Sequence, residues 1–304
     1  MNGGPVEPKF DRCAIQEHEP ELGYEHPMHA CFEPIYAFNI HTALSHMNLI
    51  RTACVFLLTG VFSAYLCSAQ VVQKIDTPRG QSVEMLLDFP SGAEPFPVLL
   101  LAPGQGYHAR LPVLENLAQS LKAQGVAVVR FNWAYFSKDP KSGEPSEGFT
   151  KEVEDFRAVL KALRQVKSLD LGRLALGGKS LGTLVAWQVF RDEPTAVASV
   201  LLTPVCISQS DDKATEAMFE NYVGLRDNTR PLLLLSGDAD SICPSKFLYN
   251  AASRIADRTR VVVIGGDHSF RAKDGDDAKQ QSEVNLDLAV RITTDFVVSK
   301  LRKP

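Results

Sequence analysis

Short apolar runs alternate with longer amphipathic stretches from residue 70 to the end of the chain. The last six of eight runs are continuously hydrophobic, which is typical of strands buried on both faces of a parallel sheet. Between the runs, apolar residues recur every three or four positions, as on one face of a helix. The pattern predicts strands at 71–77, 83–89, 98–103, 126–132, 173–177, 197–203, 231–237 and 260–266, and helices at 110–124, 149–168, 181–192, 244–257 and 283–301.

This order of elements predicts an α/β protein. Strands that alternate with helices build right-handed crossovers and a sheet covered by helices on both faces. The first two strands have no helix between them, so we expect them to form an antiparallel hairpin at one edge. The expected fold is a mostly parallel eight-stranded sheet in a single domain, 70–304. Two stretches without a clear pattern, 133–148 and 204–230, are expected to fold over a site at the carboxyl ends of the strands.

The first 69 residues have a different texture. Residues 1–46 hold five of the seven histidines, several prolines and no hydrophobic period, which predicts disorder. From Met47 a short basic start is followed by an apolar stretch and by small residues that end at Ala69. This is typical of a secretory signal peptide over 47–69, cleaved after Ala69. The alternative is a membrane anchor, since the charge-free span 52–73 is long enough to cross a bilayer.

Charge argues against a signal anchor that begins at Met1. Residues 1–51 contain three basic and seven acidic side chains, whereas a segment left in the cytoplasm normally carries an excess of Lys and Arg. Our hypothesis is that translation starts at Met47 and that residues 1–46 are an artefact of the assigned start. The mature protein, 70–304, is then exported to the periplasm or secreted.

Composition limits the classes of partner. The chain is 45% hydrophobic and 22% charged, with a net charge of -4. It has no basic stripe that would neutralise phosphates, so we expect no nucleic-acid partner. Four of the six cysteines precede residue 70, and no CxxC or HxxxH spacing suggests a metal site. The remaining two, Cys206 and Cys243, follow strands expected to be neighbours, but spacing alone leaves open whether they form a disulfide.

The segment LGGKSLGT, 176–183, places Ser180 between Gly178 and Gly182. It follows a predicted strand and opens a predicted helix, which is the setting of a nucleophile elbow. Larger residues at the two glycine positions would collide with the neighbouring strand or helix. The alternative is that Ser180 only caps the helix.

A serine nucleophile requires a base, and residues 70–304 contain only His108 and His268. His268 follows the last predicted strand, and the order nucleophile, acid, histidine in this kind of fold favours it. His108 precedes the serine and is interpreted as a surface side chain.

The histidine requires a carboxylate partner, and Asp238 and Asp240 both follow the strand at 231–237. We favour Asp240, because Gly237 turns the chain and the side chain three positions later is usually presented to the histidine loop. Asp238 is then an ordinary loop carboxylate, and Asp267 is the third choice.

Two backbone N–H groups would form an oxyanion hole. One belongs to Leu181, which follows the serine, and the other to Gln105, which lies between Gly104 and Gly106 in the loop after the third strand.

The segments GGKSLG, APGQG, GDADSICP and GDHSF resemble those of the α/β-hydrolase superfamily, in its small dienelactone-hydrolase-like branch. The resemblance covers nearly all of 70–304. It implies the α/β-hydrolase fold and a serine hydrolase that forms an acyl-enzyme on a small-molecule acyl substrate. The catalytic triad would be Ser180, Asp240 and His268. The resemblance implies no metal and no organic cofactor. Two residues depart from the pattern. Pro103 stands where many relatives have a histidine. Lys179 occupies the variable elbow position, where it would either favour an anionic or polar neighbour or, as we expect, carry a solvated charge.

The triad does not define the substrate. Peptidases or amidases, thioesterases and acyltransferases share it with esterases, and a non-catalytic binding protein could use the same fold. The short insertion after the sixth strand argues against a large lid.

Overall fold

The computed structural model describes residues 70–210, 213–256 and 259–302. The predictions for 1–46 and for a signal peptide at 47–69 concern residues outside this range. The main sheet has eight strands in the order β1-β2-β4-β3-β5-β6-β9-β10. Its strands are β1 (Gln70–Asp76), β2 (Ser82–Asp88), β3 (Phe96–Ala102), β4 (Ala127–Asn132), β5 (Leu169–Lys179), β6 (Ala196–Leu202), β9 (Leu232–Gly237) and β10 (Thr259–Ile264).

Within the main sheet, the pairs β1–β2 and β2–β4 are antiparallel and the other five pairs are parallel. The mostly parallel eight-stranded sheet and its antiparallel edge hairpin are therefore confirmed. Because β3, β5, β6, β9 and β10 run in the same direction, the loops that follow them emerge at one edge of the sheet.

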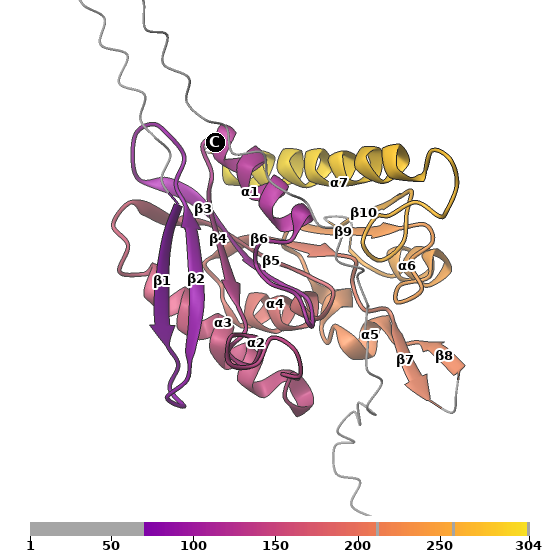
Figure 1. Cartoon of the computed structure of the whole chain (residues 1–304), viewed down its shortest axis with the longest axis horizontal. Coiled ribbons are helices and arrows are strands. Elements are labelled where there is room, and N and C mark those ends of the chain that lie inside the picture. Colours follow the sequence, from indigo (N-terminus) through magenta and orange to yellow (C-terminus); the bar gives the residue numbers. More distant parts are fainter. Residues whose placement is uncertain (1–69, 211–212, 257–258, 303–304) are drawn as a thin grey trace, which may run out of the picture. The chain divides into compact units, whose positions relative to one another are not determined.

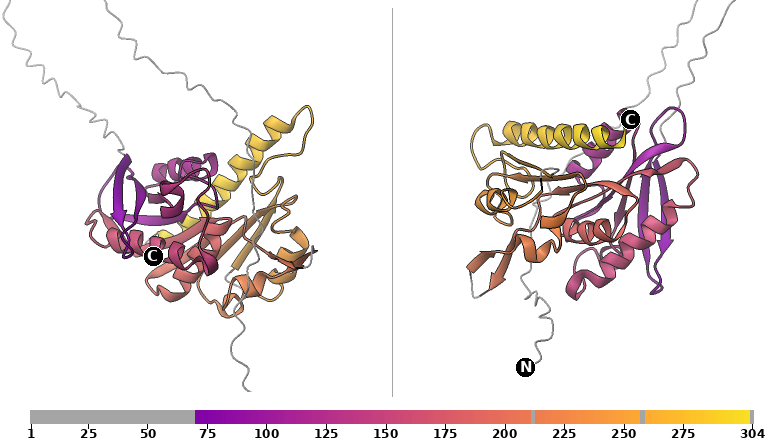
Figure 2. Two further views of the ribbon diagram at one scale, coloured as in Figure 1. Left: turned by 60° about the horizontal axis from the view of Figure 1, so that its bottom comes forward. Right: turned by 180° about the vertical axis from the view of Figure 1, so that it is seen from behind.

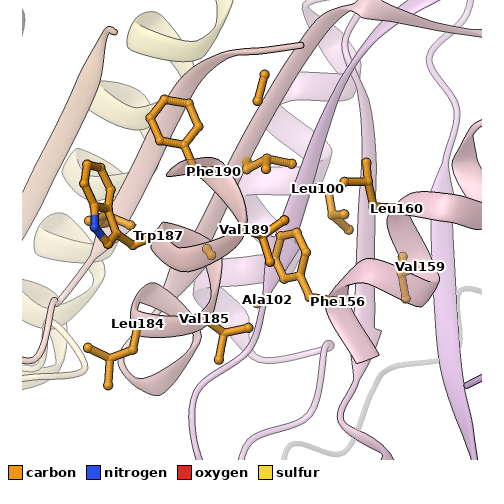
Figure 3. Packing of buried hydrophobic residues seen from close by; sticks show 14 of the residues in the cluster. Leu100, Ala102, Phe156, Val159, Leu160, Leu184, Val185, Trp187, Val189 and Phe190 are labelled. Atoms are coloured by element: carbon orange, nitrogen blue, oxygen red, sulfur yellow. The ribbon is translucent and has the colours of Figure 1, made fainter. Parts of the chain in front are cut away.

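Helices cover both faces of the sheet, as predicted. Figure 1 shows α1 (Pro112–Ala123) and α7 (Ala278–Leu301) on one side, and α3 (Thr150–Leu163) and α4 (Leu181–Asp192) on the other. Each side has its own hydrophobic cluster, because the strands carry apolar side chains on both faces. In Figure 3, Phe156 and Val159 of α3 and Val189 of α4 lie in the same hydrophobic cluster as Leu100 of β3.

Several short elements lie in the two stretches for which the sequence predicts none. A helix, α2 (Ala134–Lys138), follows β4, and a hairpin of β7 (Ile207–Ser210) and β8 (Lys213–Glu216) follows β6. Figures 1 and 2 show this hairpin extending away from the main sheet. These elements are too short to show a hydrophobic period. The others are η1 (Glu147–Phe149), α5 (Met218–Asn221) and η2 (Leu225–Asp227). Outside these stretches, α6 (Ser245–Ala252) corresponds to the helix predicted at 244–257.

A disulfide joins Cys206 and Cys243, with their Cα atoms 4.5 Å apart. Both side chains are fully buried. The bond connects the segment after β6 to the loop after β9, and a backbone hydrogen bond of 3.1 Å from Cys206 N–H to Ile242 O reinforces this connection. The structure thus answers the question that the spacing of the two cysteines left open.

Replacing both cysteines, Cys206→Ala with Cys243→Ala, should lower the free energy of unfolding by about 3–4 kcal/mol, because the bond closes a long loop in the unfolded chain. The half-cystines are 37 positions apart. Urea denaturation under non-reducing conditions measures the difference, and reduced wild type serves as the comparison. Equal unfolding free energies for oxidised wild type and the double variant would contradict the prediction.

Candidate active site

Ser180 lies in a sharp turn between β5 and α4. Its backbone has φ 52° and ψ -125°, a strained conformation for a residue with a side chain. The turn depends on glycine at two positions. A Cβ on Gly178 would lie 2.2 Å from the Gly182 carbonyl, and a Cβ on Gly182 would lie 2.4 Å from Pro103 O. These collisions agree with the requirement for glycine expected from the sequence.

The Ser180 hydroxyl does not cap α4. Its side chain makes no capping hydrogen bond, and Oγ instead lies 2.8 Å from Nε2 of His268. The structure therefore decides against the helix-cap alternative. Ser180 is only 3% exposed, and it stands at the positive end of the α4 dipole.

The Asp240 carboxylate accepts hydrogen bonds from several directions. Nδ1 of His268 lies 2.9 Å from each of its oxygens. Ser236 Oγ donates to Oδ2 at 2.8 Å, and the N–H groups of Ile242 and Cys243 donate to Oδ1 at 2.8 and 3.1 Å. An ionised carboxylate only accepts, so Nδ1 carries the imidazole proton and Nε2 is free to accept from Ser180.

Two opposing effects determine the pKa of Asp240. Burial acts to raise it, but the hydrogen bond and electrostatic interaction with His268, together with the hydrogen bonds from Ser236 and Cys243, lower the pKa below its ordinary value. Asp240 is therefore held as a carboxylate.

The other candidates are bound elsewhere. Asp238 accepts a hydrogen bond from Gly266 N–H at 2.9 Å. Asp267 forms an ion pair of 3.0 Å with Arg271. His108 is exposed, and its Nδ1 accepts from Arg110 N–H at 3.1 Å. Among the carboxylates and histidines considered, the structure brings only Asp240 and His268 to Ser180.

The residues expected to form an oxyanion hole lie next to the nucleophile. Leu181 is the first residue of α4, where N–H groups have no acceptor inside the helix. Gln105 lies in the loop after β3, and this loop contacts the elbow closely: a Cβ on Gly104 would be 3.2 Å from Cβ of Ser180. Leu181 therefore follows Ser180 directly, and Gly104, which precedes Gln105, lies against it.

Lys179 does not carry a solvated charge, so that expectation is wrong. Its side chain is 2% exposed, and Nζ lies 4.4 Å from the ring centroid of Tyr107. A cation over the face of an aromatic ring is attracted by the ring quadrupole, which offsets part of the cost of burial.

A buried polar chain behind the elbow was not anticipated. Val205 N–H donates to the Tyr222 hydroxyl at 2.8 Å, and this hydroxyl lies 2.7 Å from Thr183 Oγ1. Thr183 Oγ1 in turn donates to the Ser180 carbonyl, so the Tyr222 proton is directed to Thr183. Burial raises the pKa of Tyr222, and its hydroxyl stays protonated.

Among the site residues that the sequence did not predict, only Ser236 had a recognisable signal in the sequence. Ser236 is the single polar residue in the buried strand run LLLLSG, and a polar group at such a position requires a partner. Tyr222 and Thr183 gave no comparable signal. Within the described residues, no group of three His, Cys, Asp or Glu side chains is arranged to hold a metal ion.

Replacing Asp240 by Asn should change the dependence of stability on pH. Because the folded-state pKa of Asp240 is lowered, its carboxylate stabilises the fold above its ordinary pKa near 3.8, and this contribution is lost as the pH falls through the lower folded-state value. At neutral pH we expect Asp240→Asn to cost about 1–3 kcal/mol. Urea denaturation from about pH 7 to about pH 2.5 should show the difference shrinking in acid. A pH-independent difference would contradict the assignment.

Comparisons with known proteins agree with this architecture. Residues 95–298 match the sequence profile of the family described as alpha/beta hydrolase domain. Similar solved structures include an α/β serine hydrolase homologue from Coxiella burnetii, with 22% identity, a TM-score of 0.56 and coverage of 73% of this chain and 96% of that chain. The esterase domain of a Rhodothermus marinus protein has 20% identity, a TM-score of 0.51 and coverage of 73% and 98%.

A Xanthomonas campestris protein described as an α/β serine hydrolase without a lid has 19% identity, a TM-score of 0.51 and coverage of 74% of this chain and 94% of that chain. At these identities the structural similarities establish the fold. The family match spans two thirds of the sequence and includes all three residues that meet at the elbow. The chain belongs to the α/β-hydrolase family.

Proposed function

We propose that this protein is a serine hydrolase that cleaves a carboxylic ester or related acyl bond through an acyl-enzyme. The observation that carries the proposal is the continuous hydrogen-bond chain from Ser180 Oγ through His268 to Asp240. A serine hydroxyl becomes nucleophilic when a positioned base removes its proton, and a carboxylate on the far side of that base stabilises the charge it acquires.

In the proposed reaction, Ser180 Oγ attacks the substrate carbonyl carbon while its proton passes to Nε2 of His268. The imidazolium then gives this proton to the leaving oxygen as the bond to the acyl carbon breaks. A water molecule repeats the sequence on the acyl-enzyme, with His268 first taking and then returning a proton. Asp240 remains ionised throughout, in keeping with its lowered pKa.

The negative charge on the substrate oxygen would be stabilised by the N–H groups of Leu181 and Gln105. Each would donate to the oxygen at the tetrahedral stage, when its charge is largest. Apart from the substrate and water, every group in this scheme belongs to the protein chain, so the scheme uses neither a metal nor an organic cofactor.

The substrate in this proposal is a small molecule with a compact acyl group. Ser180 and His268 are 3% and 4% exposed, which leaves little open surface at the nucleophile. The similar structures include an esterase domain and a serine hydrolase described as lacking a lid. Short-chain esters are therefore the first substrates to test.

Labelling with a fluorophosphonate should depend on the triad. We expect wild type to label, Ser180→Ala to lose labelling completely, and His268→Ala or Asp240→Asn to react more slowly by roughly 10³-fold to 10⁴-fold. Ser199→Ala is the matched control, because Ser199 is fully buried in β6 and is not a member of the triad. In-gel fluorescence over time measures the rates. Folded wild type that neither labels nor hydrolyses p-nitrophenyl acetate would reject the catalytic proposal in favour of a binding protein.

We also propose that the mature protein is exported, with 47–69 as its signal peptide. The Cys206–Cys243 disulfide supports this proposal, because such bonds persist mainly in oxidising compartments. Membrane association would follow only if the span 52–73 were retained as an anchor. None of the helices in the described part of the chain is both long and apolar enough to cross a bilayer.

Expression of the full sequence in a bacterium, followed by mass spectrometry of the exported fraction, should give a protein that begins at Gln70. Replacing Ala69 by Arg should block cleavage, because the processing site requires small residues. Recovery of peptides from residues 1–46 when the gene is expressed with its own ribosome-binding site would contradict a start at Met47.

A further inference from the structure

Trp133 connects β4 to α2 at the catalytic edge of the sheet and is fully buried. Its indole Nε1–H lies 3.2 Å from Pro103 O and 3.2 Å from Gly104 O, so one donor is shared between two successive carbonyls. Both carbonyls belong to the loop after β3, which carries Gln105. Trp133 is therefore in direct contact with the backbone of the proposed oxyanion hole.

The direction of one carbonyl fixes the direction of the next N–H. Gly104 O and Gln105 N–H belong to the same planar trans peptide, in which the two groups point in opposite directions. When the indole holds Gly104 O, it turns Gln105 N–H away from Trp133. In the described loops, the Gln105 N–H makes no backbone hydrogen bond of its own, so it is available to a ligand.

We propose that Trp133 is a positioning residue that orients the Gly104–Gln105 peptide, and thereby aims Gln105 N–H at the oxygen that becomes negative during acyl transfer. This inference rests on the proposed hydrolase function. Trp133 does not touch the reacting atoms; it acts through the peptide that does. This orientation matters because Gln105 N–H must already point at the oxygen when the reaction begins, since reorienting it during the reaction would raise the activation barrier.

The indole is itself held firmly. Its ring packs edge-on against Phe131, with centroids 4.8 Å apart. The next residue, Ala134, donates its N–H to the buried carboxylate of Asp155 at 2.9 Å. Trp133 is thus fixed on both sides by β4 and α3, two elements of the rigid scaffold.

The loop is also held at its far end. Ala109 N–H donates to Asn132 Oδ1 at 2.7 Å, and Ala109 O accepts from Arg130 at 2.8 Å. The segment held in this way runs from Gly104 to Ala109 and includes a second glycine, Gly106, with φ +69°. A segment with two glycines has many accessible backbone conformations, so the indole bond selects one of them. Pro103, which departs from the pattern of many relatives, contributes one of the two carbonyls that the indole binds.

Trp133→Phe tests the proposal, because it removes the N–H donor and keeps an aromatic ring. The matched control is Trp187→Phe. Trp187 is also buried, and its indole also donates to a backbone carbonyl, Val223 O at 2.9 Å. It lies on α4 next to Phe190, as Figure 3 shows. Both variants lose an indole hydrogen bond and some ring volume, but only one of these bonds belongs to the oxyanion loop.

With p-nitrophenyl acetate we expect Trp133→Phe to lower kcat by about 10-fold to 100-fold with KM nearly unchanged, less than the loss that follows deletion of an oxyanion donor itself. Trp187→Phe should retain kcat within about 2-fold, because its bond does not touch the site. A trifluoromethyl ketone, which forms a charged tetrahedral adduct on Ser180, should bind Trp133→Phe more weakly by the same factor as the loss of kcat/KM. A purely structural role for Trp133 would not produce that parallel.

If Trp133→Phe fails to fold, benzothienylalanine introduced at position 133 by amber suppression replaces it, since this residue keeps the shape of the indole and lacks the N–H. Full kcat in either variant, or equal losses at positions 133 and 187, overturns the positioning role while leaving the hydrolase proposal intact. Wild type without hydrolysis or labelling overturns the hydrolase proposal itself. The two failures are therefore distinguishable.

Discussion

The close approach of the α4 N-terminus to the carboxyl end of β3 sets the spacing on which the rest of the site depends. Gly182 has no room for a Cβ because Pro103 O and Ala102 O would lie within 2.7 Å of it. This contact places the elbow against the loop that carries Gln105, and it forces Ser180 into a positive φ. A strained nucleophile persists only when its surroundings over-determine it. Here the bond from Ser180 N–H to Leu202 O, at 3.0 Å, and the buried hydroxyl chain behind the elbow do so.

The segment directly after β6 connects the two halves of the site. Val205 binds Tyr222 and through it the elbow, whereas Cys206 is joined to the acid loop by the disulfide. The Cys243 N–H in turn contacts the Asp240 carboxylate. The nucleophile and the acid are thus connected through two adjacent residues, Val205 and Cys206. Because the polar atoms of this network are mutually hydrogen-bonded, their burial strengthens the interactions and specifies one arrangement.

The sequence predicts the elements that are long enough to show a period. All eight strands of the main sheet and all five predicted helices are present, whereas α2, α5 and the β7–β8 hairpin are too short to be recognised. Ser180, Asp240 and His268 could be selected because each follows a strand whose end lies at one edge. Trp133 and Tyr222 could not, because no motif marks them and only the folded chain brings them to their partners, 30 and 39 positions away. The burial of Lys179 likewise depends on a ring from a different loop.

The two proposed oxyanion donors follow one physical rule. Leu181 N–H shares its peptide with Ser180 O, and Thr183 holds that carbonyl through its N–H at 2.8 Å and through its hydroxyl. Gln105 N–H shares its peptide with Gly104 O, which the Trp133 indole holds. In a planar trans peptide, a donor that binds the carbonyl fixes the opposite N–H without contacting it. The protein can therefore orient both N–H groups from behind while leaving them unobstructed for a substrate oxygen.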